Sequence, residues 1–227
     1  MVMGVTYNPK IATDGLVLCL DAANRRSYPG TGTTWSDLAG ANDGTLTNMD
    51  ASNFSTDNGG VLSFDGSNQR VDTGVNPATL VGNGNPATIS AWFYSYTTSQ
   101  TMFLGQGSAS RFYIEQYNRS GSLVAHWGFG DSQNALTSQA FINTNTWYNY
   151  TATYDGSIAK GYLNGINTDT TSIGGPKGYS GSLSVGSWGP SGGFYFSGRI
   201  STVNVYNRAL TADEIRQNYN ATKGRYS

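Results

Sequence analysis

Few side chains in this sequence could carry acid–base or nucleophilic chemistry. Glu115 and Glu214 are the only glutamates, and His126 is the only histidine. Hydrolysis of a glycosidic bond needs two carboxyl groups facing the bond, one as the acid and the other as nucleophile or base. Glu115 has no acidic neighbour within four residues on either side, and Glu214 has the spacing of a helix-capping residue. We therefore expect no catalytic residues in this chain, so that it is not an enzyme.

The same scarcity bears on other reaction centres and on metals. His126 lies mid-strand beside Trp127 with no nucleophile motif near it, which favours a satisfied or exposed strand histidine. Cys19 is the only cysteine, so a zinc site built from His and Cys ligands is excluded, and we expect this thiol to be buried and unpaired. Calcium needs only clustered oxygens, but Asp residues in turns usually bond their own backbone. We expect no cofactor, with calcium as the one metal left open.

Aromatic and amide side chains near turns point to a different chemistry, the binding of sugars. A sugar stacks its apolar face on an aromatic ring while amides and carboxylates bind its hydroxyls. The residues that we expect to bind a glycan are Trp188, Tyr195, Trp127, Tyr117, Asn118 and Asp131. Trp92 and Trp147 are expected in the core, whereas for Trp188 the sequence fits core packing as well as surface binding.

These side chains must be positioned by strands. Apolar or alternating runs bounded by Gly-containing turns predict strands at Leu16–Leu20, Thr88–Tyr96, Arg111–Tyr117, Leu123–Phe129 and Ile158–Leu163. The dipeptide Asn164-Gly165 predicts a tight hairpin turn after the last of these runs. The chain thus has the pattern of an all-β protein with many short strands.

One helix is predicted, near the C-terminus. Thr211 is a suitable N-cap, Glu214 three residues later completes a capping box, and Gly224 is placed to end the helix in a left-handed turn. No other segment has a helical pattern, so the helix is expected to be the only one.

Composition and charge restrict the partners. The 227 residues carry a formal net charge of −1 and are only 12% charged, so no basic field favours nucleic acid. No segment has the length and apolarity of a membrane span or of a signal peptide, so we expect synthesis in a cytoplasm and no membrane insertion.

We divide the chain into an extended N-terminal arm, residues 1–14, and a single domain, residues 15–227. Apolar residues in the arm, including Val2 and Tyr7, could dock on a neighbouring molecule by adding to a sheet edge.

Five markers in a fixed order resemble the laminin-G-like branch of the concanavalin A-like lectin/glucanase superfamily. They are Gly15 to Asp21, Phe64-Asp65-Gly66, Thr88 to Trp92, Trp147 to Gly165, and Gly198 to Leu210. The resemblance implies an all-β fold, a jelly-roll sandwich of two antiparallel sheets closed by one short C-terminal α-helix. Two positions depart from the family pattern: Ser201 and the pair Asn68-Gln69 stand where acidic residues are common, which argues against a calcium site of the family type.

Virion proteins of phages carry domains of this kind, and this resemblance directs the functional expectation. It implies a non-enzymatic structural or surface-display protein of a virion, as a capsid decoration or tail-associated module, with glycan adhesion as a further role. Its partners would be other virion proteins or copies of itself and a cell-surface glycan, and its location the virion. The alternative is a soluble or secreted calcium-dependent lectin that acts outside the cell, and a third possibility is a divergent glycoside hydrolase.

Overall fold

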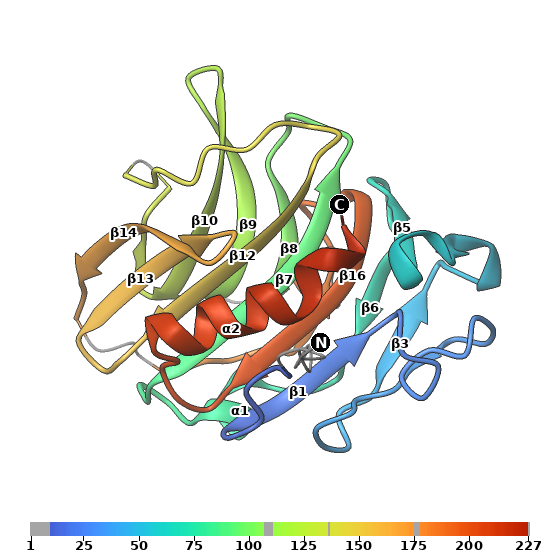
Figure 1. Cartoon of the computed structure of the whole chain (residues 1–227), viewed down its shortest axis with the longest axis horizontal. Helices are drawn as coiled ribbons and strands as arrows, with labels where there is room; N and C mark the ends of the chain where they lie inside the picture. Colours follow the sequence, from blue (N-terminus) through green and yellow to red (C-terminus); the bar gives the residue numbers. More distant parts are fainter. Residues whose placement is uncertain (1–9, 107–110, 136, 175–177, 227) are drawn as a thin grey trace, which may run out of the picture.

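A computed structural model describes residues 10–106, 111–135, 137–174 and 178–226, and strands are its main regular secondary structure (Figure 1). Sheet A contains β1 (Leu16–Asp21), β4 (Phe54–Ser55), β5 (Val61–Asp65), β7 (Ala87–Ser95), β12 (Trp147–Tyr154), β13 (Ile158–Leu163), β14 (Ile166–Ser172) and β16 (Ser197–Tyr206). Sheet B contains β2 (Thr34–Trp35), β3 (Gly44–Thr47), β6 (Arg70–Asp72), β8 (Thr101–Gln106), β9 (Arg111–Arg119), β10 (Ser122–Gly130), β11 (Ser132–Gln133) and β15 (Leu183–Val185). The described helices are α1 (Pro77–Val81), α2 (Ala212–Thr222) and the 3₁₀ turns η1 (Ala51–Asn53), η2 (Asp57–Gly59) and η3 (Lys223–Arg225).

The two sheets are antiparallel and form a sandwich. Sheet A has the order β14-β13-β12-β7-β16-β5-β4, and β1 pairs with β16 beyond the end of β5. Sheet B has the order β11-β10-β9-β8-β15-β6-β3-β2. Consecutive strands form hairpins in both sheets, whereas pairs such as β7 with β16 and β6 with β15 join distant parts of the sequence, as in a jelly roll. The expected fold, an all-β jelly-roll sandwich with one C-terminal helix, is confirmed.

The inner faces of both sheets supply the core. Alternate residues of β7 and β10 point inward, and the ring of Phe93 in sheet A stacks on that of Phe103 in sheet B with centroids 3.8 Å apart. Because successive side chains of a strand point to opposite faces, each strand of this sandwich has one buried and one outward row. Cys19 is buried and unpaired, as expected, and burial raises the pKa of its thiol to about 12.

Helix α2 crosses the outer face of sheet A, in front of β7, β12 and β16 (Figure 1). Its start follows the predicted capping box: the Thr211 hydroxyl accepts the Glu214 N–H, and the Glu214 carboxylate accepts the Thr211 N–H. Its predicted end is wrong, since the chain continues into η3 and Gly224 is not left-handed. The short helix α1, begun by the Asn76 cap and Pro77, was not predicted.

The β13–β14 hairpin has the predicted tight turn. Asn164 and Gly165 both have positive φ, 52° and 78°, which matches the right-handed twist of the two strands. An added Cβ on Gly165 would lie 3.2 Å from Tyr219 Cβ, so this turn also packs closely on α2.

The described end of the N-terminal arm, residues 10–14, is attached to α2. The Ala12 N–H donates to Asn218 Oδ1 at 2.7 Å, and the Tyr206 hydroxyl donates to the Ala12 carbonyl at 3.0 Å. The apolar arm residues Val2, Val5 and Tyr7 lie outside the described residues.

Candidate functional site

Alternation along β9 and β10 places a row of polar and aromatic side chains on the outer face of sheet B. Phe112 and Ile114 of β9 point into the core, so Tyr113, Glu115 and Tyr117 point outward. His126 of β10 pairs with Glu115 across the two strands and shares this outer face. The strand pattern alone therefore gathers these four side chains.

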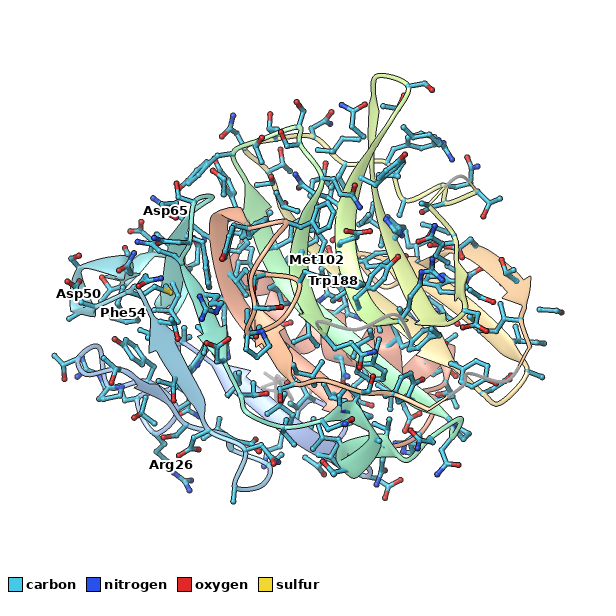
Figure 2. All side chains as sticks on the ribbon, turned by 180° about the vertical axis from the view of Figure 1, so that it is seen from behind. Arg26, Asp50, Phe54, Asp65, Met102 and Trp188 are labelled. Atoms are coloured by element: carbon cyan, nitrogen blue, oxygen red, sulfur yellow. The ribbon has the colours of Figure 1, made fainter. Side chains whose placement is uncertain are left out.

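A glycine-rich loop, residues 186–195, covers the neighbouring strand β8. The Met102 N–H donates to the Phe194 carbonyl and the Gly186 N–H to the Phe103 carbonyl, which fixes both ends of the loop to β8. A Cβ on Gly105 would lie only 2.9 Å from the Ser187 carbonyl oxygen, so a glycine there allows the close approach. The loop brings Trp188 over the sheet, where Figure 2 shows it beside Met102.

The loop and the strands together form a continuous row of ring contacts, which we call the sheet B aromatic row. Trp188 packs edge-to-face on Phe194 at 6.4 Å and on Tyr113 at 5.4 Å. His126 lies between Tyr113 and Tyr117, with centroids 5.7 Å from each. Phe194 is 49% exposed and Trp188 and Tyr117 are partly exposed, so the row presents apolar ring surface to solvent.

Phe194 has a backbone conformation that is unusual for its type. Its φ is 48°, in the left-handed region that bulky side chains seldom adopt. Such strain persists only where surrounding contacts enforce it, and it clusters at binding sites. Here it keeps a large apolar ring in solvent at the end of the row.

A buried contact between Glu115 and His126 lies within the row. Glu115 Oε1 is 2.7 Å from His126 Nε2, and the two side chains are 2% and 0% exposed. The Gln100 side-chain amide donates to both carboxylate oxygens, at 3.2 and 3.1 Å. The Glu115 oxygen lies off the direction of a ring N–H, so the contact is electrostatic rather than a linear hydrogen bond.

The ring nitrogens of His126 both face oxygen atoms. Nδ1 is 3.3 Å from the Trp127 carbonyl, which can only accept, so a proton on Nδ1 satisfies that contact. The pair fixes the imidazole between the two tyrosines.

Tyr113 crosses the sheet toward its edge. Its hydroxyl donates to Gln133 Oε1 at 2.6 Å, and its ring covers Gly128, where an added Cβ would be 2.5 Å from Tyr113 Cζ. Burial, and next the charge of Glu115, raises the pKa of Tyr113, so its hydroxyl stays protonated and acts as a donor. Gln133 itself is exposed and places an amide at the rim of the row.

Two of the predicted glycan-binding residues, Trp188 and Tyr117, lie within the row. Tyr195 is partly exposed in the same loop, with its hydroxyl against Gly192. Asn118 is exposed at the β9–β10 hairpin, where its side chain accepts the Gly121 N–H. Asp131 is exposed in the turn after β10, and its carbonyl accepts from Arg111 at 2.7 Å. The last two therefore lie at opposite ends of the two strands.

The prediction for Trp127 is wrong. Its side chain is fully buried in the core, because it belongs to the inward row of β10 with Ala125 and Phe129. Its indole N–H donates to Asp169 Oδ2 at 3.0 Å, which satisfies the donor inside the protein. A sugar cannot reach this ring.

The expectation that Trp92 and Trp147 are core residues also needs correction. Trp92 is buried, but beneath α2 on the outer face of sheet A, with its indole N–H donating to Thr222 Oγ1 at 2.8 Å. Trp147 is partly exposed on the same outer face. Neither ring lies between the sheets.

Sequence reasoning missed Tyr113, Gln133 and the pairing of Glu115 with His126. The period-two spacing of Tyr113, Glu115 and Tyr117 was a usable signal, since it puts all three on one face. Gln133 could not be found in this way, because its place depends on the turn after β10.

Within the described residues, no cluster of three or more His, Cys, Asp or Glu side chains is arranged to hold a metal ion. Calcium binding stays a prediction. None of the described helices has the length and apolarity needed to cross a membrane.

Comparisons with known proteins agree with this architecture. A family model for the Concanavalin A-like lectin/glucanases superfamily matches residues 64–216. A search of curated protein sequences finds no match.

Solved structures share the fold at low sequence identity. Domain 4 of AbnA, a GH43 extracellular arabinanase from Geobacillus stearothermophilus solved in complex with arabinotriose, is 18% identical with a TM-score of 0.63, over 90% of this chain and 98% of that one. A mutant Trypanosoma rangeli sialidase with trans-sialidase activity is 16% identical with a TM-score of 0.67, over 96% of this chain. This chain spans only 34% of that sialidase.

Proposed function

We propose a function for this chain from its family and its exposed rings: it belongs to the Concanavalin A-like lectin/glucanases superfamily, and it acts as a non-enzymatic carbohydrate-binding module. The sheet B aromatic row carries the proposal. Trp188 and Phe194 offer ring faces for stacking on a sugar, and Gln133 offers an amide at the rim for its hydroxyls.

Binding rather than hydrolysis is favoured by the state of Glu115. Among the described residues its polar partners are Gln100 and His126, not a second carboxylate. A glycosidase that retains configuration pairs two carboxyl groups about 5 Å apart beside the bond. The buried Glu115 is therefore proposed to hold the aromatic row in place.

The test is a binding assay with a variant of a partly exposed ring of the row. Trp188→Ala should weaken glycan binding by about 1–3 kcal/mol if the ring is a stacking hot spot. Arabinotriose is the first probe, because it is the ligand of the arabinanase domain, and a glycan array widens the search. Phe141→Ala is the matched control, since Phe141 is a 48% exposed ring that contacts Arg119 outside the row. Equal binding by wild type and Trp188→Ala would contradict the proposal.

The finer proposal is that this module serves as a structural or surface-display protein of a virion. The sequence resemblance to phage domains supports it, and the arm's role in assembly stays a prediction, because residues 1–9 lie outside the described residues. Peptides of this chain should be found by mass spectrometry in purified particles from a source that encodes it. Their absence from such particles would favour the alternative, a secreted lectin.

A further inference from the structure

A cavity lies on the other sheet, away from the sheet B aromatic row. It has a volume of about 390 Å³ and lies on the outer face of sheet A, beside the end of α2. Its lining residues are Trp92, Trp147, Asn164, Tyr219, Lys223 and Tyr226, with Gly224. This volume is within the range of small-molecule sites in proteins. We call it the α2-end groove.

Aromatic rings form the wall of this groove. Tyr226 stacks on Trp92 with centroids 3.9 Å apart and planes at 20°, and Trp147 contacts Tyr226 at 4.8 Å. Trp92 is the buried base of the cluster, whereas Trp147, Tyr219 and Tyr226 are partly exposed. Packing of the C-terminus against the sheet accounts for Trp92, but it leaves part of the other rings facing an open cavity.

The same wall continues along β7. Tyr94 contacts Trp147 at 5.5 Å and Tyr96 at 5.6 Å, and Tyr96 is 45% exposed. Trp92 and Tyr94 share one face of β7 because they alternate along the strand, and Tyr96 follows directly after the end of the strand. The ring surface is therefore longer than one sugar, as an oligosaccharide site requires.

The charged side chain among the described lining residues of the groove is the cation Lys223. Lys223 is exposed, and its ammonium lies 5.5 Å from the centre of the Tyr219 ring. No carboxylate is among the lining residues that the structure describes. Asn164 uses its Oδ1 to accept the Asn149 N–H at 2.9 Å, which leaves the two amide hydrogens of Asn164 to a ligand.

We propose that the α2-end groove is a second carbohydrate site that takes an acidic pyranoside, a sugar of the hexuronate class. The apolar face of the sugar ring stacks on Trp147 and Tyr226. Its carboxylate pairs with Lys223 in a charge-assisted contact, and a hydroxyl accepts from the Asn164 amide. This site does not depend on the Trp188 row, because it lies on the opposite sheet.

The test uses trigalacturonate as the acidic probe and maltotriose as the uncharged comparison, with the full chain and tryptophan fluorescence as the readout. Trigalacturonate should bind more tightly than maltotriose. Lys223→Gln should weaken trigalacturonate binding by about tenfold while maltotriose binding is unchanged, the factor expected for one charge-assisted contact. Lys223→Arg should restore most of the difference.

Two control variants distinguish the α2-end groove from the rest of the protein surface. Arg216→Gln removes an exposed cation from the same helix, outside the groove, and should leave trigalacturonate binding unchanged. Trp188→Ala should also leave it unchanged, so failure of the sheet B proposal would not imply failure here. Trp147→Ala should abolish binding of both probes, with circular dichroism showing that the variant is folded. No binding of trigalacturonate by wild type, or equal binding by Lys223→Gln, would overturn the proposal.

Discussion

At the residue scale, the contact of Glu115 with His126 is the most unusual feature of the outer face of sheet B. Both side chains are almost completely removed from solvent, and among the described residues only Gln100 donates hydrogen bonds to the carboxylate. A buried ion pair has a desolvation cost that its attraction seldom exceeds, so an apolar pair of similar size can be equally stable. The position of His126 against both rings fits a role of the pair in fixing the orientation of Tyr113 and Tyr117.

This view predicts the stability of single and double variants. His126→Leu removes one of the two described polar partners of the buried Glu115 carboxylate and leaves Gln100, so the free energy of unfolding should fall by about 3–5 kcal/mol. Adding Glu115→Leu removes the uncompensated charge and should recover most of that loss. Urea denaturation of the three proteins measures both effects. A double variant less stable than His126→Leu would show that the pair itself stabilises the fold.

Which single residues could be assigned from sequence depended on the alternation of strands. Trp127 shares the inward face of β10 with Ala125 and Phe129, two residues away on either side. Strict application of strand alternation to the sequence would therefore have predicted a core position for Trp127. The same reasoning would have predicted that Tyr113 lies on the outer face of sheet B. Trp188 was different, because its position is set by hydrogen bonds between its loop and β8, which join residues 83 and 92 positions apart and leave no local pattern.

At the element scale, the start of α2 is a small charged network. Glu214 accepts from both terminal nitrogens of Arg208, at 2.9 and 2.6 Å, and also from the Thr211 N–H. The Arg208 hydrogen bond, above all, lowers the pKa of Glu214 from 4.5 to about 2. The network joins the connection that follows β16 to the helix that covers sheet A.

The lowered pKa predicts how stability changes with acid. Since the folded-state pKa of Glu214 is below its unfolded value, its contribution is complete above about pH 4.5 and is lost as the pH falls toward 2. Glu214→Gln should lower the free energy of unfolding at pH 7 by about 1 kcal/mol, because solvent screens this partly exposed pair. The stability difference between wild type and variant should shrink as the pH falls from 4.5 to 2.5 in urea denaturation.

The control for this prediction is Asp213→Asn, which removes an exposed carboxylate from the same first turn. It should leave the acid-dependent loss of stability largely as in wild type. A Glu214→Gln protein that loses stability with acid as steeply as wild type would mean that other carboxylates account for this part of the curve.

The two ends of α2 show what local sequence can specify. Its start was predictable, since the capping box involves residues only three apart. Its end was not, because Tyr219 and Tyr226 pack on Trp92, more than 120 residues away, and this contact favours continuation into η3 over a left-handed turn at Gly224. The hairpin turn at Asn164-Gly165 was predictable for the same reason as the start of α2, because its two positive φ angles are a property of the dipeptide itself.

At the scale of the whole molecule, the two proposed sites lie on different sheets of the sandwich. The sheet B aromatic row is on the outer face of β8 to β10, and the α2-end groove is on the outer face of β7 and β12. The outer faces of a two-sheet sandwich point in opposite directions. One molecule therefore cannot place both sites on the same flat surface, but it can hold two separate polysaccharide chains.

Because the two sites face opposite directions, we expect one molecule to bridge two polysaccharide chains. We expect no gain in affinity on a single surface, since both sites cannot engage it together. Wild type mixed with pectin, which has galacturonate and neutral arabinose units, should increase light scattering, because each molecule joins two chains. Trp188→Ala and Lys223→Gln should each keep binding through the remaining site but lose most of the scattering. On a surface coated with either sugar, wild type should bind no more tightly than the variant that keeps the matching site, since linked sites gain affinity only where both can engage together. Scattering by both single-site variants equal to that of wild type would mean that bridging arises elsewhere, for example from self-association of the chain.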